Sequence, residues 1–279
     1  MSHTPASLKG HKCYILRAIV DPVFSPRPAM MRLLLFVALI FATVRPGLAA
    51  TVQVATASNF SQPLRLLAQA FEKESEHKVR ISTASTGKLY AQIKHGAPYH
   101  LFLSADQKRP EKLEQEGLTV PGSRFTYAMG QLVLWAPRQQ FQGEAKALIS
   151  QADLRRFSIA NPKIAPYGVA ARQTLKAMGL WEQLQGRLVR GENIAQTFQF
   201  VASRAAEMGF IAHSQLSEEV KSTGYHWMVP QALHDPIRQD AVLLKRGAEN
   251  PAAKTFHAFL QSERARALIS ALGYGLDSH

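Results

Sequence analysis

The chain has 279 residues, and 46% of them are hydrophobic, so it can bury the core of one or two domains and is too apolar to be a disordered or fibrous protein. Its formal net charge is +13, but the basic residues are scattered among acidic ones, which argues against a nucleic-acid-binding surface. A positive field of this kind would still steer small anions toward a cleft.

The N-terminal part has the pattern of a secretory signal peptide over residues 30–49. Arg32 provides the positive start, an apolar stretch follows from Leu33 to Val44, and Gly47 to Ala49 has the small residues of a cleavage site. The apolar stretch is about a dozen residues long, short of the roughly 20 that a membrane-spanning helix needs. We therefore predict that residues 1–49 are removed on export to the periplasm, and that residues 1–29 result from a start codon placed too far upstream.

Removal of this leader changes the charge and the cysteine content. Residues 1–49 hold six Lys or Arg side chains and one Asp, so the remaining chain has 27 basic and 19 acidic side chains and a net charge of +8. The single cysteine, Cys13, is lost with the leader. The exported chain is therefore expected to have no disulfide, no thiolate chemistry and no cysteine for lipid attachment, and to be freely soluble.

From residue 51 the sequence alternates short apolar runs with stretches of helical periodicity. We predict strands at 52–56, 79–83 and 100–104, and helices at 60–74, 86–94 and 106–116, the last capped by Asp106. Three strand–helix units in succession predict a mainly parallel sheet covered by helices on both faces.

A strand at 131–136 begins a second group of elements. This group has predicted strands at 157–160 and 209–212 and predicted helices at 167–178 and 193–205. After Pro230 we expect a strand from Ala241 and two helices, capped by Asn250 and Ser262. The pattern alone does not say whether these last elements return to the first group.

Two polar loops each follow a predicted strand and precede a predicted helix: Ser58 with Asn59, and Ser85 with Thr86. A helix start has backbone N–H groups without intrahelical partners and a partial positive charge, so two such starts that face one point would bind an anion. The alternative is that these side chains only cap helices. Capping needs one polar residue where each loop has two, and both loops lie at the carboxyl ends of strands, where open sheets place ligands.

A third loop, residues 164–169, leads into the helix of the second group. Pro166 and Gly168 on either side of Tyr167 fit a tight loop that presents backbone N–H groups and the Tyr167 phenol. An ordinary turn with a packed tyrosine is the alternative.

Enzymatic patterns are absent from the sequence. The histidines have no metal-ligand spacing, no Gly-x-Ser-x-Gly turn occurs, and His213 with Ser214 has no evident third partner. The segment 86–88 has part of a phosphate-loop pattern without its spaced glycines. We therefore expect no catalysis, no cofactor and no direct metal ligands.

Several motifs together resemble the periplasmic molybdate-binding proteins of ABC importers. They are Ala57–Phe60, Ser85–Tyr90, Gly96–Pro98, Leu103–Gln107, Pro166–Gly168 and Gly273–Gly275. The resemblance covers the chain from about residue 51. It implies an α/β fold of the type II periplasmic-binding-protein kind, a clamshell of two lobes that each have a mainly parallel sheet flanked by helices.

The resemblance also implies that the chain crosses the hinge twice. Residues 50–128 and 236–279 would then form lobe 1, and residues 129–235 would form lobe 2. The tetrahedral dianion would lie between the lobes, held by hydroxyls and backbone N–H groups without a counter-charge. The implied partners are this oxyanion and a membrane permease, and the implied protein is a monomer that binds no nucleic acid.

Carried over by position, the resemblance implies six ligand-binding residues. Ser58 falls on the first-loop hydroxyl with Asn59 beside it, and Thr86 falls on the second-loop hydroxyl with Ser85 adjacent. Tyr167 falls on the loop residue of the second lobe, and Ile194 on the residue that donates its backbone N–H at a helix start.

One departure concerns the end of the strand at 209–212. Some members have a ligand tyrosine there, whereas this chain has Ala212, which lacks a hydroxyl. Either Tyr167 replaces that contact or the anion has one donor fewer, which puts selectivity among oxyanions in doubt.

The loop chemistry favours an anion without a proton. Molybdate, tungstate and sulfate need only donors at neutral pH, whereas phosphate keeps a proton and is best recognised by a site with an acceptor. The loops at 57–61, 84–88 and 165–169 contain no Asp or Glu. The choice between molybdate and sulfate depends on cavity size, so sulfate or another small anion is one alternative ligand, and an enzyme or sensor on the same fold is an alternative function.

Overall fold

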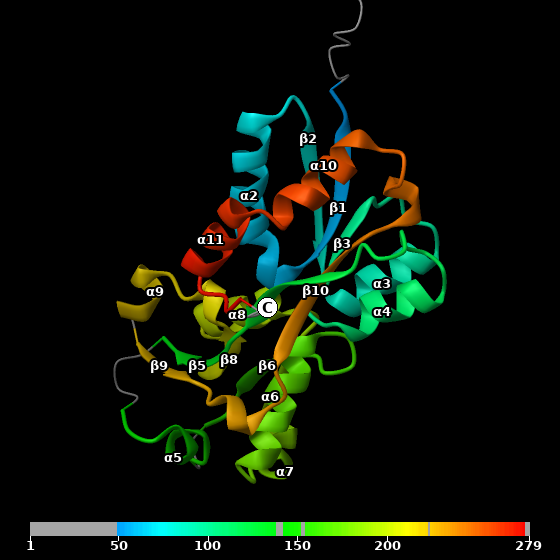
Figure 1. Ribbon diagram of the computed structural model, residues 1–279. Helices are drawn as coiled ribbons and strands as arrows, with labels where there is room; N and C mark the ends of the chain where they lie inside the picture. The colour runs from blue at the N-terminus through cyan, green and yellow to red at the C-terminus, as the bar shows by residue number, and fades with distance from the viewer. Residues whose placement is uncertain (1–48, 138–141, 152–153, 223, 277–279) are drawn as a thin grey trace, which may run out of the picture. The chain divides into compact units, whose positions relative to one another are not determined.

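The computed structural model describes residues 49–137, 142–151, 154–222 and 224–276 (Figure 1). The signal sequence predicted at 30–49, apart from Ala49, and Cys13 lie outside these ranges. The elements described below all belong to one compact unit that begins at residue 48. None of the helices in these ranges has the length and apolar character needed to cross a membrane.

Two sheets of five strands organise the fold (Figure 1). The first has the order β2-β1-β3-β10-β4, with bounds β1 Thr51–Ala57, β2 Lys78–Ala84, β3 Leu101–Leu103, β4 Phe125–Gly130 and β10 Ile237–Leu243. The second has the order β7-β6-β8-β5-β9, with bounds β5 Leu132–Ala136, β6 Phe157–Ala160, β7 Leu188–Gly191, β8 Met208–Ala212 and β9 Tyr225–Met228.

The pairing directions repeat in the two sheets. In the first sheet β1 is parallel to β2 and β3, while β10 is antiparallel to both of its neighbours. In the second sheet β6 is parallel to β7 and β8, while β5 is antiparallel to both of its neighbours. One strand in each sheet therefore runs against the others, and the sheets are mainly parallel, as predicted.

The chain passes between the sheets twice. It leaves the first sheet after β4, builds the second from β5 to β9, and returns to the first with β10. The predicted α/β fold with two lobes and two hinge crossings is confirmed. Below, lobe 1 and lobe 2 denote the first and the second sheet with their helices.

Helices accompany both sheets. The helices of lobe 1 are α2 Ser61–Glu74, α3 Thr86–Lys94, α4 Lys108–Gln115, α10 Pro251–Leu260 and α11 Glu263–Ala271. Those of lobe 2 are α5 Ala145–Ile149, α6 Pro166–Ala177, α7 Trp181–Leu184, α8 Ile194–Ala202 and α9 Glu218–Ser222. Short 3₁₀ turns include η1 Ser58–Phe60, η3 His213–Gln215 and η5 Lys245–Gly247. Three of the α-helices begin at a side-chain cap, Asn193, Asn250 or Ser262.

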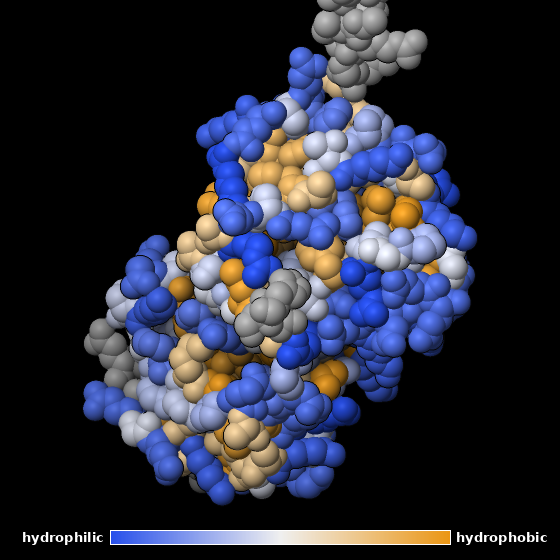
Figure 2. Space-filling model, viewed as in Figure 1, coloured by the Kyte–Doolittle hydropathy of each residue, from blue (hydrophilic) through white to orange (hydrophobic). Residues whose placement is uncertain are grey.

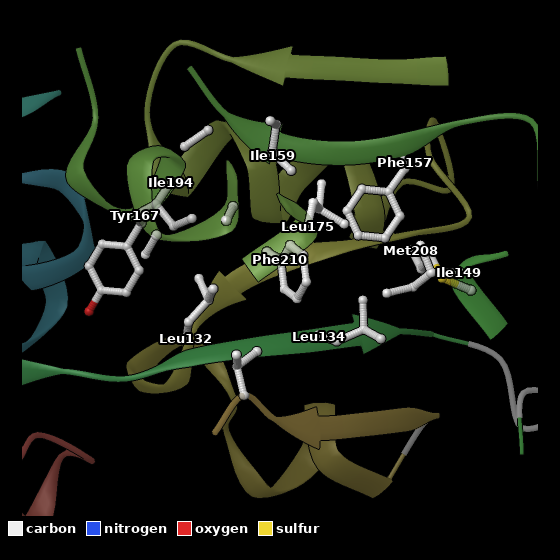
Figure 3. Close-up of a cluster of buried hydrophobic side chains, with 14 of the residues drawn as sticks. Leu132, Leu134, Ile149, Phe157, Ile159, Tyr167, Leu175, Ile194, Met208 and Phe210 are labelled. Carbon is white, nitrogen blue, oxygen red and sulfur yellow. The ribbon is translucent and has the colours of Figure 1, made fainter. Parts of the chain in front are cut away.

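Each lobe has its own apolar core. In lobe 1, α2 buries Leu64, Leu67 and Phe71, which recur at helical spacing, against the sheet. In lobe 2, Phe157 of β6 meets Phe210 of β8 edge to face, and α6 packs Leu175 onto them (Figure 3). On the face of the molecule in Figure 2, hydrophilic residues predominate and apolar ones are scattered.

Some elements differ from the predictions. The strands β4, β7 and β9 and the short helices α5, α7 and α9 were not predicted, and β10 begins at Ile237 rather than at Ala241. The helix expected from Phe60 begins instead as the turn η1, and α2 follows from Ser61.

Candidate functional site

One small cavity brings the six predicted residues together. Ser58, Asn59, Ser85, Thr86, Tyr167 and Ile194 line it, along with Ala57, Ala105, Ala165, Pro166 and Asn193. The volume of this cavity is about 10 Å³. That is below the roughly 300–1,000 Å³ of sites for drug-sized ligands, so the cavity suits a small ion. Ala212 is not part of the lining.

The strand order explains why the loops meet. Ala57 pairs with Ala84 at the ends of the parallel strands β1 and β2, so the loops that follow them are neighbours. Ala105 follows the next parallel strand, β3. In lobe 2, α6 and α8 follow the parallel strands β6 and β7. The carboxyl ends of both sheets thus face the cavity, the position where open α/β sheets bind ligands.

The start of α6 offers a free amide. Pro166 has no N–H, and the amides of Gly168 and Val169 both donate to Ala165 O, at 3.0 and 3.2 Å. Tyr167 N makes no hydrogen bond within the described residues. This amide, at the positive end of the helix, therefore remains for a ligand.

The start of α8 offers a second one. Asn193 caps the helix by accepting from Gln196 N at 3.0 Å, and Ala195 N donates to Ser58 Oγ at 3.4 Å. Among the described residues no partner is present for Ile194 N. Ile194 is thus suited to the role that the sequence predicted for it, donation through the backbone.

The hydroxyl groups in the cavity differ in their partners. Thr86 Oγ1 accepts from Ala105 N at 3.1 Å, and Ser58 Oγ accepts from Ala195 N, so each keeps a proton to donate. Ser85 Oγ is buried and has no partner in the described part of the chain. A buried polar group without a partner costs roughly 1–3 kcal/mol, so Ser85 is the hydroxyl with most to gain from a ligand.

Asn59 uses its side chain elsewhere. Its Nδ2 donates to Gln239 Oε1 at 2.8 Å and to the Tyr274 hydroxyl at 3.0 Å, which uses both of its protons. Asn59 lines the cavity, but only its backbone is left to contact a ligand there.

The Tyr167 phenol is also engaged away from the cavity, because it accepts from Gln239 Nε2 at 3.3 Å. Burial, the largest cause, and the nearby Tyr274 raise the pKa of Tyr167 well above its ordinary value of 10.0. The phenol therefore stays neutral at physiological pH.

The cavity has no formal charge of its own. None of its lining residues is Asp, Glu, Lys, Arg or His. In the described ranges no group of His, Cys, Asp and Glu side chains is arranged to hold a metal ion. The arrangement provides neutral donors from several loops, which is the chemistry for binding an anion.

Both lobes touch at the rim of the cavity, so the structure is a closed form. Gly87 N donates to Ile164 O at 2.9 Å, and Lys88 Nζ lies 2.5 Å from Glu192 Oε2. Gly87 and Lys88 belong to α3 of lobe 1, whereas Ile164 and Glu192 belong to loops of lobe 2.

Sequence reasoning did not single out several residues that shape the site. The sequence predicted that Asn193 lies within a helix, but it did not predict that Asn193 caps α8. Gln239 and Gly130 give no sequence signal, because a Gln in an apolar strand and a Gly at a strand end are both common. Tyr274 lies in a motif of the resemblance, but nothing in that motif indicates its contact with Asn59.

A two-lobed α/β protein with a small, uncharged, donor-lined cavity between its lobes has the design of a clamshell solute-binding protein. The family described as bacterial extracellular solute-binding protein matches residues 52–275, and the chain belongs to this family.

Individual relatives agree with this assignment. The chain is 50% identical to the molybdate-binding protein ModA of Azotobacter vinelandii over 229 residues, which is 82% of this chain and 91% of that protein. It is 43% identical to ModA of Rhodobacter capsulatus over 237 residues, 85% of this chain and 93% of that protein. The solved periplasmic molybdate-binding protein of A. vinelandii superposes with a TM-score of 0.78 and 42% identity, over 81% of this chain and all of that one. The resemblance found in the sequence motifs is thereby confirmed.

Proposed function

We propose that this chain is the solute-binding protein of an ABC importer, which captures molybdate or tungstate in the periplasm and delivers it to the membrane permease. The names of the close relatives support the ligand. The observation that carries the proposal is the cavity between the lobes, which is lined by neutral donors and contains no acceptor carboxylate.

The donors proposed for the anion come from both lobes. The hydroxyls of Ser58, Ser85 and Thr86 lie on lobe 1, and the amides of Tyr167 and Ile194 lie on lobe 2. Asn59 contributes through its backbone. A hydrogen bond to a charged group contributes roughly 1.5–3 kcal/mol, so five or six of them support micromolar or tighter binding after the cost of closure.

Binding in this scheme is a shift between open and closed forms. The anion contacts donors of both lobes only when they are closed, so it stabilises the closed form that the permease recognises. The proposed lobes are residues 50–128 with 236–279, and residues 129–235. The protein acts as a monomer, and no catalytic step is part of the proposal.

The test is calorimetry on the exported protein, titrated with molybdate, tungstate, sulfate and phosphate. We expect micromolar or tighter binding of molybdate and tungstate, much weaker binding of sulfate, and none of phosphate, because the cavity lining provides no acceptor carboxylate. Sulfate binding as tight as that of molybdate would overturn the ligand assignment. Binding of none of the four anions would overturn the function.

A further inference from the structure

A buried polar contact joins the cavity to the hinge. Gln239 lies on β10, next to the second crossing between the lobes, and is fully buried. Its Oε1 accepts from Asn59 Nδ2 at 2.8 Å and from the Tyr127 hydroxyl at 3.1 Å. These two donors fix the orientation of the amide, so Nε2 faces the other way and donates to the Tyr167 hydroxyl at 3.3 Å.

Tyr167 therefore has two functional ends. Its backbone amide is at the start of α6, and the residue is part of the cavity lining. Its ring lies at the edge of the lobe 2 core, and Figure 3 shows the hydroxyl directed away from the other labelled side chains. The hydroxyl meets Gln239, which belongs to the sheet of lobe 1. The contact joins the two lobes, so a movement of one lobe against the other would act on it.

Gly130 leaves the space for this contact. It is the last residue of β4, directly before the first crossing, and it pairs with Ile237 of β10. A Cβ at this position would lie 2.4 Å from the Tyr167 hydroxyl oxygen and 2.7 Å from Gln239 Nε2. Gly130 does not have a positive φ, so its backbone would accept another residue. Glycine is required at this position because the Tyr167 phenol occupies the space that a side chain would need.

We propose that the Tyr167 phenol, Gln239 and the space at Gly130 form a hinge latch that couples occupancy of the cavity to closure of the lobes. Tyr167 and Gln239 act as positioning residues in this latch. The inference rests on the proposed function, because the anion is taken to contact Tyr167 N. The amide and the phenol belong to one residue with a packed ring, so an anion on the amide stabilises the hinge contact, and the hinge contact places the amide for the anion.

Tyr167→Phe is the direct test, because it keeps the amide and the ring and removes only the hydroxyl. A neutral hydrogen bond contributes about 0.5–1.5 kcal/mol, so we expect the affinity for molybdate to fall about three- to tenfold. Small-angle scattering of the ligand-free protein should show a larger radius of gyration than for the wild type, because fewer molecules are closed. Gly130→Ala should shift both measurements in the same direction, through the clash with the phenol.

Tyr127→Phe is the matched control. It also removes a buried phenol that contacts Gln239, but Tyr127 and its partners Ser104 and Gln239 all belong to lobe 1. We expect a lower melting temperature and an affinity within about twofold of the wild type, since Asn59 Nδ2 still donates to Gln239 Oε1 and keeps the amide directed at Tyr167, and the lost neutral hydrogen bond lies within lobe 1.

The outcomes separate the latch from the proposed function. The wild-type titration tests the function, and the ratio of variant to wild-type affinity, measured with whichever anion binds, tests the latch. Unchanged affinity and radius of gyration in Tyr167→Phe would overturn the latch, as would an equal loss of affinity in Tyr127→Phe. If the wild type binds no anion, an unchanged radius of gyration in ligand-free Tyr167→Phe still overturns the latch, and an increase supports it.

Discussion

Ser85 and Thr86 are adjacent hydroxyls with different roles. Thr86 Oγ1 accepts from Ala105 N and so holds the loop after β3, whereas Ser85 Oγ, on a residue that is 3% exposed, has no partner in the described part of the chain. Of these two hydroxyls, only that of Thr86 therefore makes a hydrogen bond that stabilises the ligand-free protein. Only removal of that hydroxyl should destabilise the free protein.

Ser85→Ala should weaken molybdate binding about tenfold or more and leave the melting temperature of the free protein unchanged or slightly higher. The lost bond to a charged ligand contributes roughly 1.5–3 kcal/mol, and the free protein loses only a desolvated hydroxyl. The matched variant Thr86→Val should weaken binding and also lower the melting temperature, because Ala105 N loses its acceptor. Calorimetry and thermal unfolding measure both effects. Full affinity with a lower melting temperature in Ser85→Ala would mean that this hydroxyl has only a structural role.

At the scale of elements, the sequence predicted the helices and strands that have a strong local sequence signal. The helices α2, α6, α10 and α11 have an apolar face, a cap or a proline in the first turn. The strand β5 is a continuous apolar run, and β1 and β6 consist mostly of buried residues. The strands β7 and β9 were missed because they are short edge strands that contain exposed residues. Their strand conformation depends on pairing with a neighbour, which local periodicity does not reveal.

His100 connects three elements and should make their stability depend on pH. It precedes β3, and its Nδ1 accepts from Gln53 N of β1 at 3.1 Å and lies 3.3 Å from Nδ2 of Asn250, the cap of α10. Both neighbours are donors, so the ring must be unprotonated there. Burial, and to a lesser extent the charge of Arg246, lowers the pKa of His100.

Since this pKa is lowered on folding, the unfolded chain binds more protons than the folded chain just below pH 6.5, the ordinary pKa of histidine. The stability from neutral His100 is therefore fully present above about pH 6.5 and is lost as the pH falls through the folded-state pKa. We expect the free energy of unfolding, measured with urea between pH 7.5 and 5, to fall less steeply in His100→Asn than in the wild type. Burial lowers the pKa of His257 as well, so some slope should remain.

The control for this prediction is His226→Asn, which changes an exposed side chain on the edge strand β9. It should leave the free energy of unfolding at pH 7.5 nearly unchanged, because the replaced side chain is exposed. Equal slopes in His100→Asn and the wild type would contradict the role given to His100.

At the scale of the whole molecule, the convergence of distant loops was available only through the family resemblance. Helix-start chemistry identified Ser58, Ser85 and Thr86 as donors, but periodicity cannot place two lobes against each other. Nor could it show that the side chain of Asn59 turns toward Gln239, because that choice depends on a partner 180 residues away. Long-range contacts of this kind are where the sequence analysis was incomplete.

The ion pair between Lys88 and Glu192 allows the closed form to be tested separately from the charge around the cavity. The two side chains are 48% and 61% exposed and lie on different lobes. Exposed pairs contribute little and are screened by salt, so we expect Glu192→Gln and Lys88→Gln each to weaken molybdate binding by up to about fivefold at low ionic strength.

The direction of the Glu192→Gln effect is decisive. If charge acted only at long range, removing a carboxylate near the cavity would strengthen binding of an anion, whereas loss of the contact between the lobes weakens it. Calorimetry at about 20 mM and 500 mM salt should show that the difference from the wild type shrinks as screening increases. Tighter binding by Glu192→Gln at low salt would show that this pair does not stabilise closure.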